Sequence, residues 1–126
     1  TNGTYLNIIK EMLLNDVADE LRPLKERVAK MVDLYAEAVE KVKASSNQAE
    51  HDFLARRLYN MTGDIIMSLL ILTDATKAPE LFAKSAQVYV RAAEEEVVGH
   101  AAYVMAFNDD DLKNFVAEET NDEAEA

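Results

Sequence analysis

The chain has 126 residues, no cysteine and a net charge of −11. Its length is enough for one domain with a hydrophobic core, and the absence of cysteine excludes disulfides, thiolate metal sites and a cysteine nucleophile. The acidic balance argues against nucleic acid and anionic membrane surfaces as partners, because both attract basic proteins.

The first predicted helix spans Tyr5–Val17, where apolar residues recur every three or four positions. Pro23 then marks a break, because proline lacks an amide proton and disfavours a helical residue before it. A second, long helix is predicted from Leu24 to Ala44, with one apolar and one charged side. The polar residues Ser45–Asn47 form the turn that follows.

A third helix is predicted from about Gln48 to Ala75, with Ser46 or Asn47 as its cap. Between Ile65 and Leu72 it is apolar on nearly every side, and only Ser68 is polar. A helix that is apolar all round must be covered on several sides, so this segment is expected at the centre of a helical assembly. Its predicted core line is Leu54, Leu58, Thr62, Ile65, Ile66, Leu69, Leu70 and Thr73.

The fourth predicted helix runs from Pro79 to about Phe107, and Pro79 suits a first helical turn. Asn108–Asp111 then breaks this helix and caps a short terminal one that carries Leu112, Phe115 and Val116. With only three glycines and two prolines, the pattern predicts an all-α fold. We expect an antiparallel bundle of three long helices, plus a shorter N-terminal helix and a short C-terminal helix.

The predicted bundle domain covers residues 1–117. The segment 118–126 holds five acids and no Lys or Arg, so it is expected to be a disordered acidic tail. The longest apolar run is too short for a bilayer, which takes about 20 residues, and no signal peptide is visible, so we expect a cytoplasmic protein. The chain does not begin with Met, and Thr1-Asn2-Gly3 is more typical of a cut inside a longer chain.

Glu96 and His100 lie one turn apart on the face of the fourth helix that carries Leu81 and Val88, which we predict to be its core side. The pair has a functional interpretation, as an acid and a base, and a structural one, as a buried polar pair in a packed interface. We favour the structural interpretation. A di-metal site needs Glu-x-x-His on two helices, and the Glu96–His100 spacing is one residue too long. We therefore expect no catalytic, cofactor-binding or metal-binding residue in this chain.

A polar line on the third helix becomes apolar halfway along its length. Arg57 and Asp64 belong to the polar part, and Met67 and Ile71 continue the same face. A plainly solvated face would stay polar, so either the N-terminal helix or another polypeptide or domain is expected to cover it. We predict Arg57, Asp64, Met67 and Ile71 to be interface residues.

A resemblance to a known family rests on the segment Arg56–His100, RRLYNMTGDIIMSLLILTDATKAPELFAKSAQVYVRAAEEEVVGH. It resembles the extra C-terminal helical domain of the larger acyl-CoA dehydrogenases, which include bacterial members and the very-long-chain type. In that family a similar stretch, with Arg-Leu, apolar residues, Asp-Ile and a run ending near Ala-Thr, forms a central bundle helix. The Leu24–Val42 helix is compatible with this, so the resemblance covers about residues 5–116.

The resemblance implies a parent enzyme that carries FAD, oxidises acyl-CoA thioesters to trans-2-enoyl-CoA and passes electrons to electron-transfer flavoprotein. The family's catalytic glutamate and most of its flavin and CoA contacts lie in the upstream dehydrogenase body, and none of those motifs occurs here. The implied partners are that body, in the same polypeptide, and a second copy, since the parents are typically dimers. Membrane association is linked to this region in the very-long-chain type, but the acidic charge here argues against it.

Three hypotheses follow. The first, which we favour, is a C-terminal accessory helical domain of an FAD-dependent acyl-CoA dehydrogenase, with a structural and oligomer-shaping role and no catalysis by itself. The second is a free-standing helical interaction module whose apolar strip binds a partner helix or itself. The third is a small metalloenzyme that uses Glu96 and His100.

Overall fold

A computed structural model describes residues 2–108 of the chain. These form the helix α1 (Asn2–Leu13), a short 3-10 turn η1 (Asp19–Leu21), and the long helices α2 (Arg22–Ala44), α3 (Gln48–Lys77) and α4 (Pro79–Ala106). The described part of the chain contains no strand, so the predicted all-α bundle is confirmed. The predicted terminal helix and acidic tail lie outside the described residues.

The long helices begin where local signals place them. The Asn47 side chain accepts hydrogen bonds from the backbone amides of Ala49 and Glu50, at 2.9 and 3.2 Å, and so caps α3. Pro23 and Pro79 each lie in the first turn of a helix, where a missing amide proton costs nothing. The predicted boundaries of the three long helices are therefore right to within two residues.

The N-terminal helix ends earlier than predicted, at Leu13 rather than Val17. The segment after it is held by contacts outside a helix: the Lys25 ammonium donates to the Asn15 carbonyl at 2.8 Å, and the Ala18 amide donates to the Thr76 hydroxyl at 3.2 Å. These partners satisfy backbone groups that a longer helix would have used, and they tie the linker to α2 and α3.

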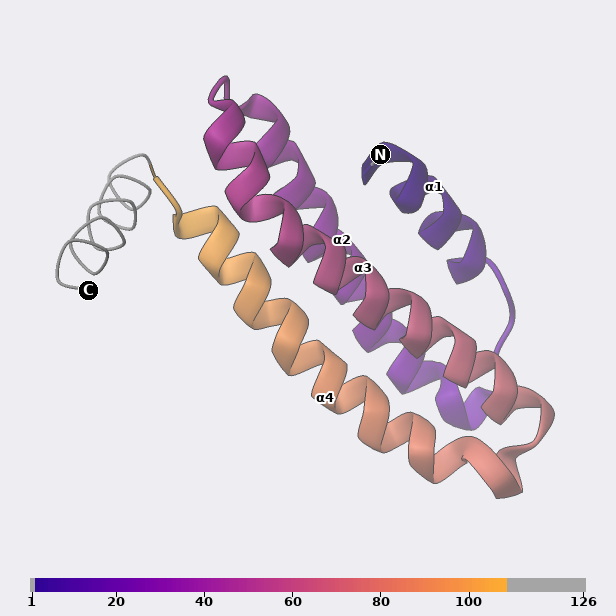
Figure 1. The fold of residues 1–126 in the computed structure, drawn as a ribbon. Helices are drawn as coiled ribbons and strands as arrows, with labels where there is room; N and C mark the ends of the chain where they lie inside the picture. Colours follow the sequence, from indigo (N-terminus) through magenta and orange to yellow (C-terminus); the bar gives the residue numbers. More distant parts are fainter. Residues whose placement is uncertain (1, 109–126) are drawn as a thin grey trace, which may run out of the picture.

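Figure 1 shows α1 and α4 on opposite sides of the pair formed by α2 and α3. Helix α4 packs against both α2 and α3, and α1 packs against the same two helices from the other side. The core between the helices is a single cluster of apolar side chains. Its largest fully buried members are Tyr35, Ile9, Met31, Leu54, Leu58, Met61, Ile65 and Leu72.

The predicted core line of α3 is largely correct, with one clear error. Leu70 is 44% exposed, whereas Ser68 is fully buried and donates its hydroxyl hydrogen to the Asp64 carbonyl at 2.8 Å. On a segment that is apolar all round, polarity cannot decide which side faces the core, so the packing of the neighbouring helices decides it. None of the helices within residues 2–108 combines the length and apolar character that crossing a bilayer demands.

Candidate functional site

Side chains of α3 and α4 line two adjoining hollows, of about 570 and 500 Å³, which meet at Tyr89. We call this surface the α3–α4 groove. One end is polar and the other is apolar, and α3 forms one wall while α4 forms the other. Its lining residues are Tyr59, Asn60, Gly63, Asp64, Met67 and Ile71 on α3, and Lys84, Ser85, Val88, Tyr89, Ala92, Glu96 and His100 on α4.

Arg57 joins α3 to α4 at the polar end of the groove. Its guanidinium donates to Nδ1 of His100 at 3.2 Å and stacks over the Tyr103 ring, with Cζ 3.6 Å from the ring centroid. Because arginine is only a donor, Nδ1 must accept, so the neutral imidazole carries its proton on Nε2. Burial, followed by the Arg57 charge, lowers the pKa of His100, and Glu96 opposes this weakly.

Asp64 and Glu96 face one another across the same end of the groove. Burial, and then the neighbouring Glu96 carboxyl, raise the pKa of Asp64 to about 7. Oδ2 of Asp64 is buried and receives no hydrogen bond from another described group, which agrees with a proton shared with the neighbouring Glu96 carboxyl. Burial and these two charges also raise the pKa of Tyr89. The Asp64 carboxyl is therefore close to half-protonated at physiological pH.

The apolar end of the groove is not covered by any described element. Met67 is 51% exposed and Val88 is 72% exposed, whereas Ile71 is half-buried against the core. The sequence left open whether the N-terminal helix or another polypeptide covers this apolar face. Helix α1 does not cover Met67, because α1 packs elsewhere on α2 and α3. The groove remains an apolar surface next to an acidic pair, which is typical of a site for another polypeptide.

The prediction of a buried Glu96–His100 pair is wrong. Glu96 is exposed, His100 is half-buried, and the hydrogen-bond partner of His100 is Arg57. The core side of α4 is built instead from smaller residues, Ala86, Val90, Ala93, Val97, Ala101 and Val104, which let α2 and α3 approach closely. Within residues 2–108, no three His, Cys, Asp or Glu side chains are grouped so as to hold a metal ion.

The structure brings Arg57, Asp64, Met67 and Ile71 to one face, with Asp64, Met67 and Ile71 in the groove and Arg57 bound to His100 at its polar end. Sequence reasoning did not foresee that Tyr89, Glu96 and His100 would join them from α4. These α4 residues lie at helical spacing on one side of the helix, but the sequence pattern does not say which side of α4 faces the core, and that depends on how the helix packs.

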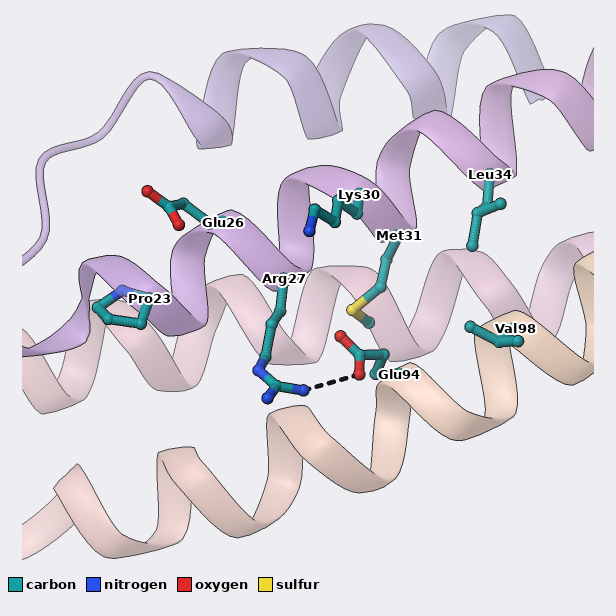
Figure 2. A pocket seen from close by; sticks show the side chains of 8 residues that line it. All are labelled: Pro23, Glu26, Arg27, Lys30, Met31, Leu34, Glu94 and Val98. Atoms are coloured by element: carbon teal, nitrogen blue, oxygen red, sulfur yellow. Dashed lines mark hydrogen bonds and ion pairs between the residues drawn. The ribbon is translucent and has the colours of Figure 1, made fainter.

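A separate hollow, of about 570 Å³, lies between α2 and α4 (Figure 2). It contains the Arg27–Glu94 ion pair, in which Nη1 and Oε1 are 2.8 Å apart. Lys30 and Glu26 stand at the same opening, so charges of both signs line it. The ion pair links α2 to α4 and is partly exposed to solvent. Because charges of both signs line the hollow, it is not suited to a ligand of one charge or to an apolar ligand.

Comparisons with known proteins agree on one family. The sequence model of a family described as "Acyl-CoA dehydrogenase C terminal" matches residues 1–112. The chain is also similar to a solved structure, the acyl-CoA dehydrogenase family protein from Porphyromonas gingivalis. That match has 34% sequence identity and a TM-score of 0.77, and covers 84% of this chain and 91% of the solved one. Among curated protein sequences, none matches the chain.

Proposed function

This chain belongs to the acyl-CoA dehydrogenase C-terminal family, and from that premise we propose that it is the accessory helical domain of an FAD-dependent acyl-CoA dehydrogenase. The parent enzyme in this proposal is of the large, very-long-chain-like bacterial type and works in cytoplasmic fatty acid β-oxidation. The domain has no catalytic role of its own. It covers the dehydrogenase body and shapes the oligomer.

The observation that carries this proposal is the α3–α4 groove. A docking surface needs apolar area that the domain itself leaves uncovered, and Met67, which is 51% exposed on the α3 wall, supplies it. It also needs polar groups that tolerate loss of water. Asp64, whose pKa is about 7, can be neutralised by a proton at little cost when another surface covers it.

The described residues do not fit FAD. The groove's polar end carries the carboxyls of Asp64 and Glu96, which would repel a pyrophosphate, and the chain has no glycine-rich loop at a helix start to hold one. The flavin and the catalytic residues therefore belong to the upstream body of the proposed parent enzyme, and no step of the oxidation is assigned to this chain.

The test of this function is the native polypeptide in its source cells. An antibody against this domain should detect a chain much longer than the 14.1 kDa segment, and the purified protein should be yellow with flavin absorbance and should oxidise an acyl-CoA thioester. A native chain close to this mass, without flavin, would overturn the proposal.

Met67→Asp is expected to weaken docking of the domain onto the dehydrogenase body without unfolding the domain. The side chain is 51% exposed in the isolated bundle, so the change costs little there, but a carboxylate buried under the body would be strongly unfavourable. Limited proteolysis of the full-length enzyme should release the variant domain at least several times faster.

Leu14→Asp is the matched control, because it places the same charge at an exposed apolar residue outside the groove. Equal release from the two variants would contradict docking through the groove. Ile71→Asp is less informative, since Ile71 packs against the core and its loss would destabilise the bundle itself.

A second candidate function is a free-standing interaction module. The observation that favours it is the apolar end of the groove, where Val88 is 72% exposed and a partner helix could pack. A native polypeptide of about 14 kDa that co-purifies with a defined partner, and loses it on Met67→Asp, would establish this alternative.

A further inference from the structure

The outward face of α4, opposite its core side, carries a stripe of residues that no other helix within residues 2–108 covers. Its members lie alternately four and three residues apart, the spacing of a coiled-coil seam. All are exposed, and Leu81 and Val88, at 70% and 72%, are the most exposed large apolar residues of α4. We call this stripe the α4 seam, and it consists of Leu81, Ser85, Val88, Ala92, Glu95 and Gly99.

Within residues 2–108, neither the backbone nor the packing explains why position 99 is a glycine. Its φ is not positive, and a Cβ built at this position would meet no atom within 4 Å. Glycine inside a helix lowers stability relative to alanine, so neither backbone strain nor internal packing favours it here. What a glycine on an exposed helix face does provide is room for a side chain from outside.

Large and small residues are ordered along the seam so that two antiparallel copies of α4 would fit together. When two copies of α4 are placed antiparallel about a two-fold axis near residue 90, Leu81 of one copy falls opposite Gly99 of the other. Val88 falls opposite Ala92 in the same way. Each large side chain thus meets a small one, which is the arrangement that lets facing helices interdigitate.

The charges along the seam agree with the same register. Lys84 flanks the seam on the side toward which Glu95 points, and the antiparallel arrangement brings Lys84 of one copy beside Glu95 of the other, twice by symmetry. The two Arg91 side chains come near the axis, where Glu95, one turn away on each helix, offsets part of their repulsion.

We propose that the α4 seam binds a second copy of this chain, α4 against α4, antiparallel, with Leu81 seated over Gly99 of the partner copy. From Leu81 to Gly99 the contact is about 27 Å long, at 1.5 Å per residue. One helix pair of this length buries less surface than a standard interface, so the isolated chain forms a weak dimer, and other contacts between the parents' bodies would strengthen it.

This inference goes beyond the proposed docking and stands independently of it. The seam occupies the α4 wall of the groove at Ser85, Val88 and Ala92, and it leaves Asp64 and Met67 on the α3 wall for the dehydrogenase body. Failure of the native-length and flavin test would therefore leave self-association unchanged, and a monomeric chain would leave the docking proposal unchanged.

The first experiment is sedimentation equilibrium of the 126-residue chain from micromolar to millimolar concentration. A monomer–dimer equilibrium is expected, and Gly99→Leu should raise its dissociation constant at least tenfold by blocking the seat of Leu81. The variant should be as stable as the unmutated chain, because a Cβ at position 99 meets no other atom within 4 Å in the monomer. Gly63→Leu is the matched control, since a Cβ there also meets nothing and the residue lies on α3, outside the seam.

The second experiment tests the direction of the pairing with single-cysteine variants, which the cysteine-free chain makes unambiguous. When Val88→Cys and Ala92→Cys are mixed under mild oxidation, disulfides between the two variants should form several times faster than disulfides within either variant. Parallel helices would instead join each variant to itself.

A chain that stays monomeric up to millimolar concentration would overturn the proposal. Equal dissociation constants for the Gly99→Leu and Gly63→Leu dimers would also overturn it, because the contact between the two copies would then lie elsewhere. Preferred cross-linking of each cysteine variant to itself would refute the antiparallel register.

Discussion

Replacing Ile65 with alanine is expected to lower the free energy of unfolding by about 3 kcal/mol, because such large-to-small changes in a packed core cost about 2–5 kcal/mol. Ile65 is fully buried in the middle of α3, within the segment that is apolar all round. The loss should appear as a lower urea midpoint and as a fall in Tm of roughly 10 °C for a domain of this size.

Met67→Ala is the matched control, two residues further along the same helix. Its side chain is 51% exposed in the groove, so its truncation should change the free energy of unfolding by less than about 1 kcal/mol. Equal losses at the two positions would mean that the isolated chain already covers the groove, for instance through self-association, and would contradict an open α3 wall.

Asp64→Asn is expected to make the chain more stable than the unmutated chain at pH 8, and this difference should shrink as pH falls from about 7 toward the ordinary carboxyl pKa of 3.8. Burial and then Glu96 raise the pKa of Asp64 to about 7 in the folded chain, against an ordinary value of 3.8. Between these values the folded chain binds more protons than the unfolded one, so the contribution of this group to stability is present below the lower pKa and is lost as pH rises through about 7.

Asparagine cannot ionise, so the Asp64→Asn chain does not lose stability as pH rises through the pKa of Asp64. Because the pair is partly exposed and screened by water, we expect a difference of roughly 1 kcal/mol at pH 8. The measurement is urea unfolding of both chains from pH 5 to pH 8. Asp33→Asn, at an exposed carboxyl of α2, deletes one negative charge outside the groove and should show a much smaller dependence on pH. The same pH dependence in both variants would contradict the Asp64–Glu96 coupling.

The helices and their ends could be predicted because short-range physics determines them. Asn47 caps α3 through amides two and three residues away, and Pro23 and Pro79 act within a single turn. The apolar period of α2 is equally local, and the apolar side that it predicts, with Val28, Met31 and Tyr35, is the buried side in the structure. The end of α1 was missed because the linker's partners, such as Thr76 on α3, are far away in sequence.

The orientation of α4 was decided by tertiary packing. Two faces of this helix compete as core sides, one with Leu81 and Val88 and the other with alanines and valines. Hydrophobicity alone favours the larger residues, but the narrow space between α2 and α3 admits the smaller ones. That choice turned Glu96 and His100 away from the core and toward the groove.

The chain's composition and periodicity by themselves determined an all-α bundle, its helices and the apolar strip on α3, whereas the folded structure showed that α1 leaves Met67 exposed. The groove required the folded structure, because its parts come from positions that no local rule connects: Arg57 meets His100 from 43 residues away, and Asp64 meets Glu96 across two helices. Local sequence determines which helices form, whereas close packing between helices determines which faces remain free to bind.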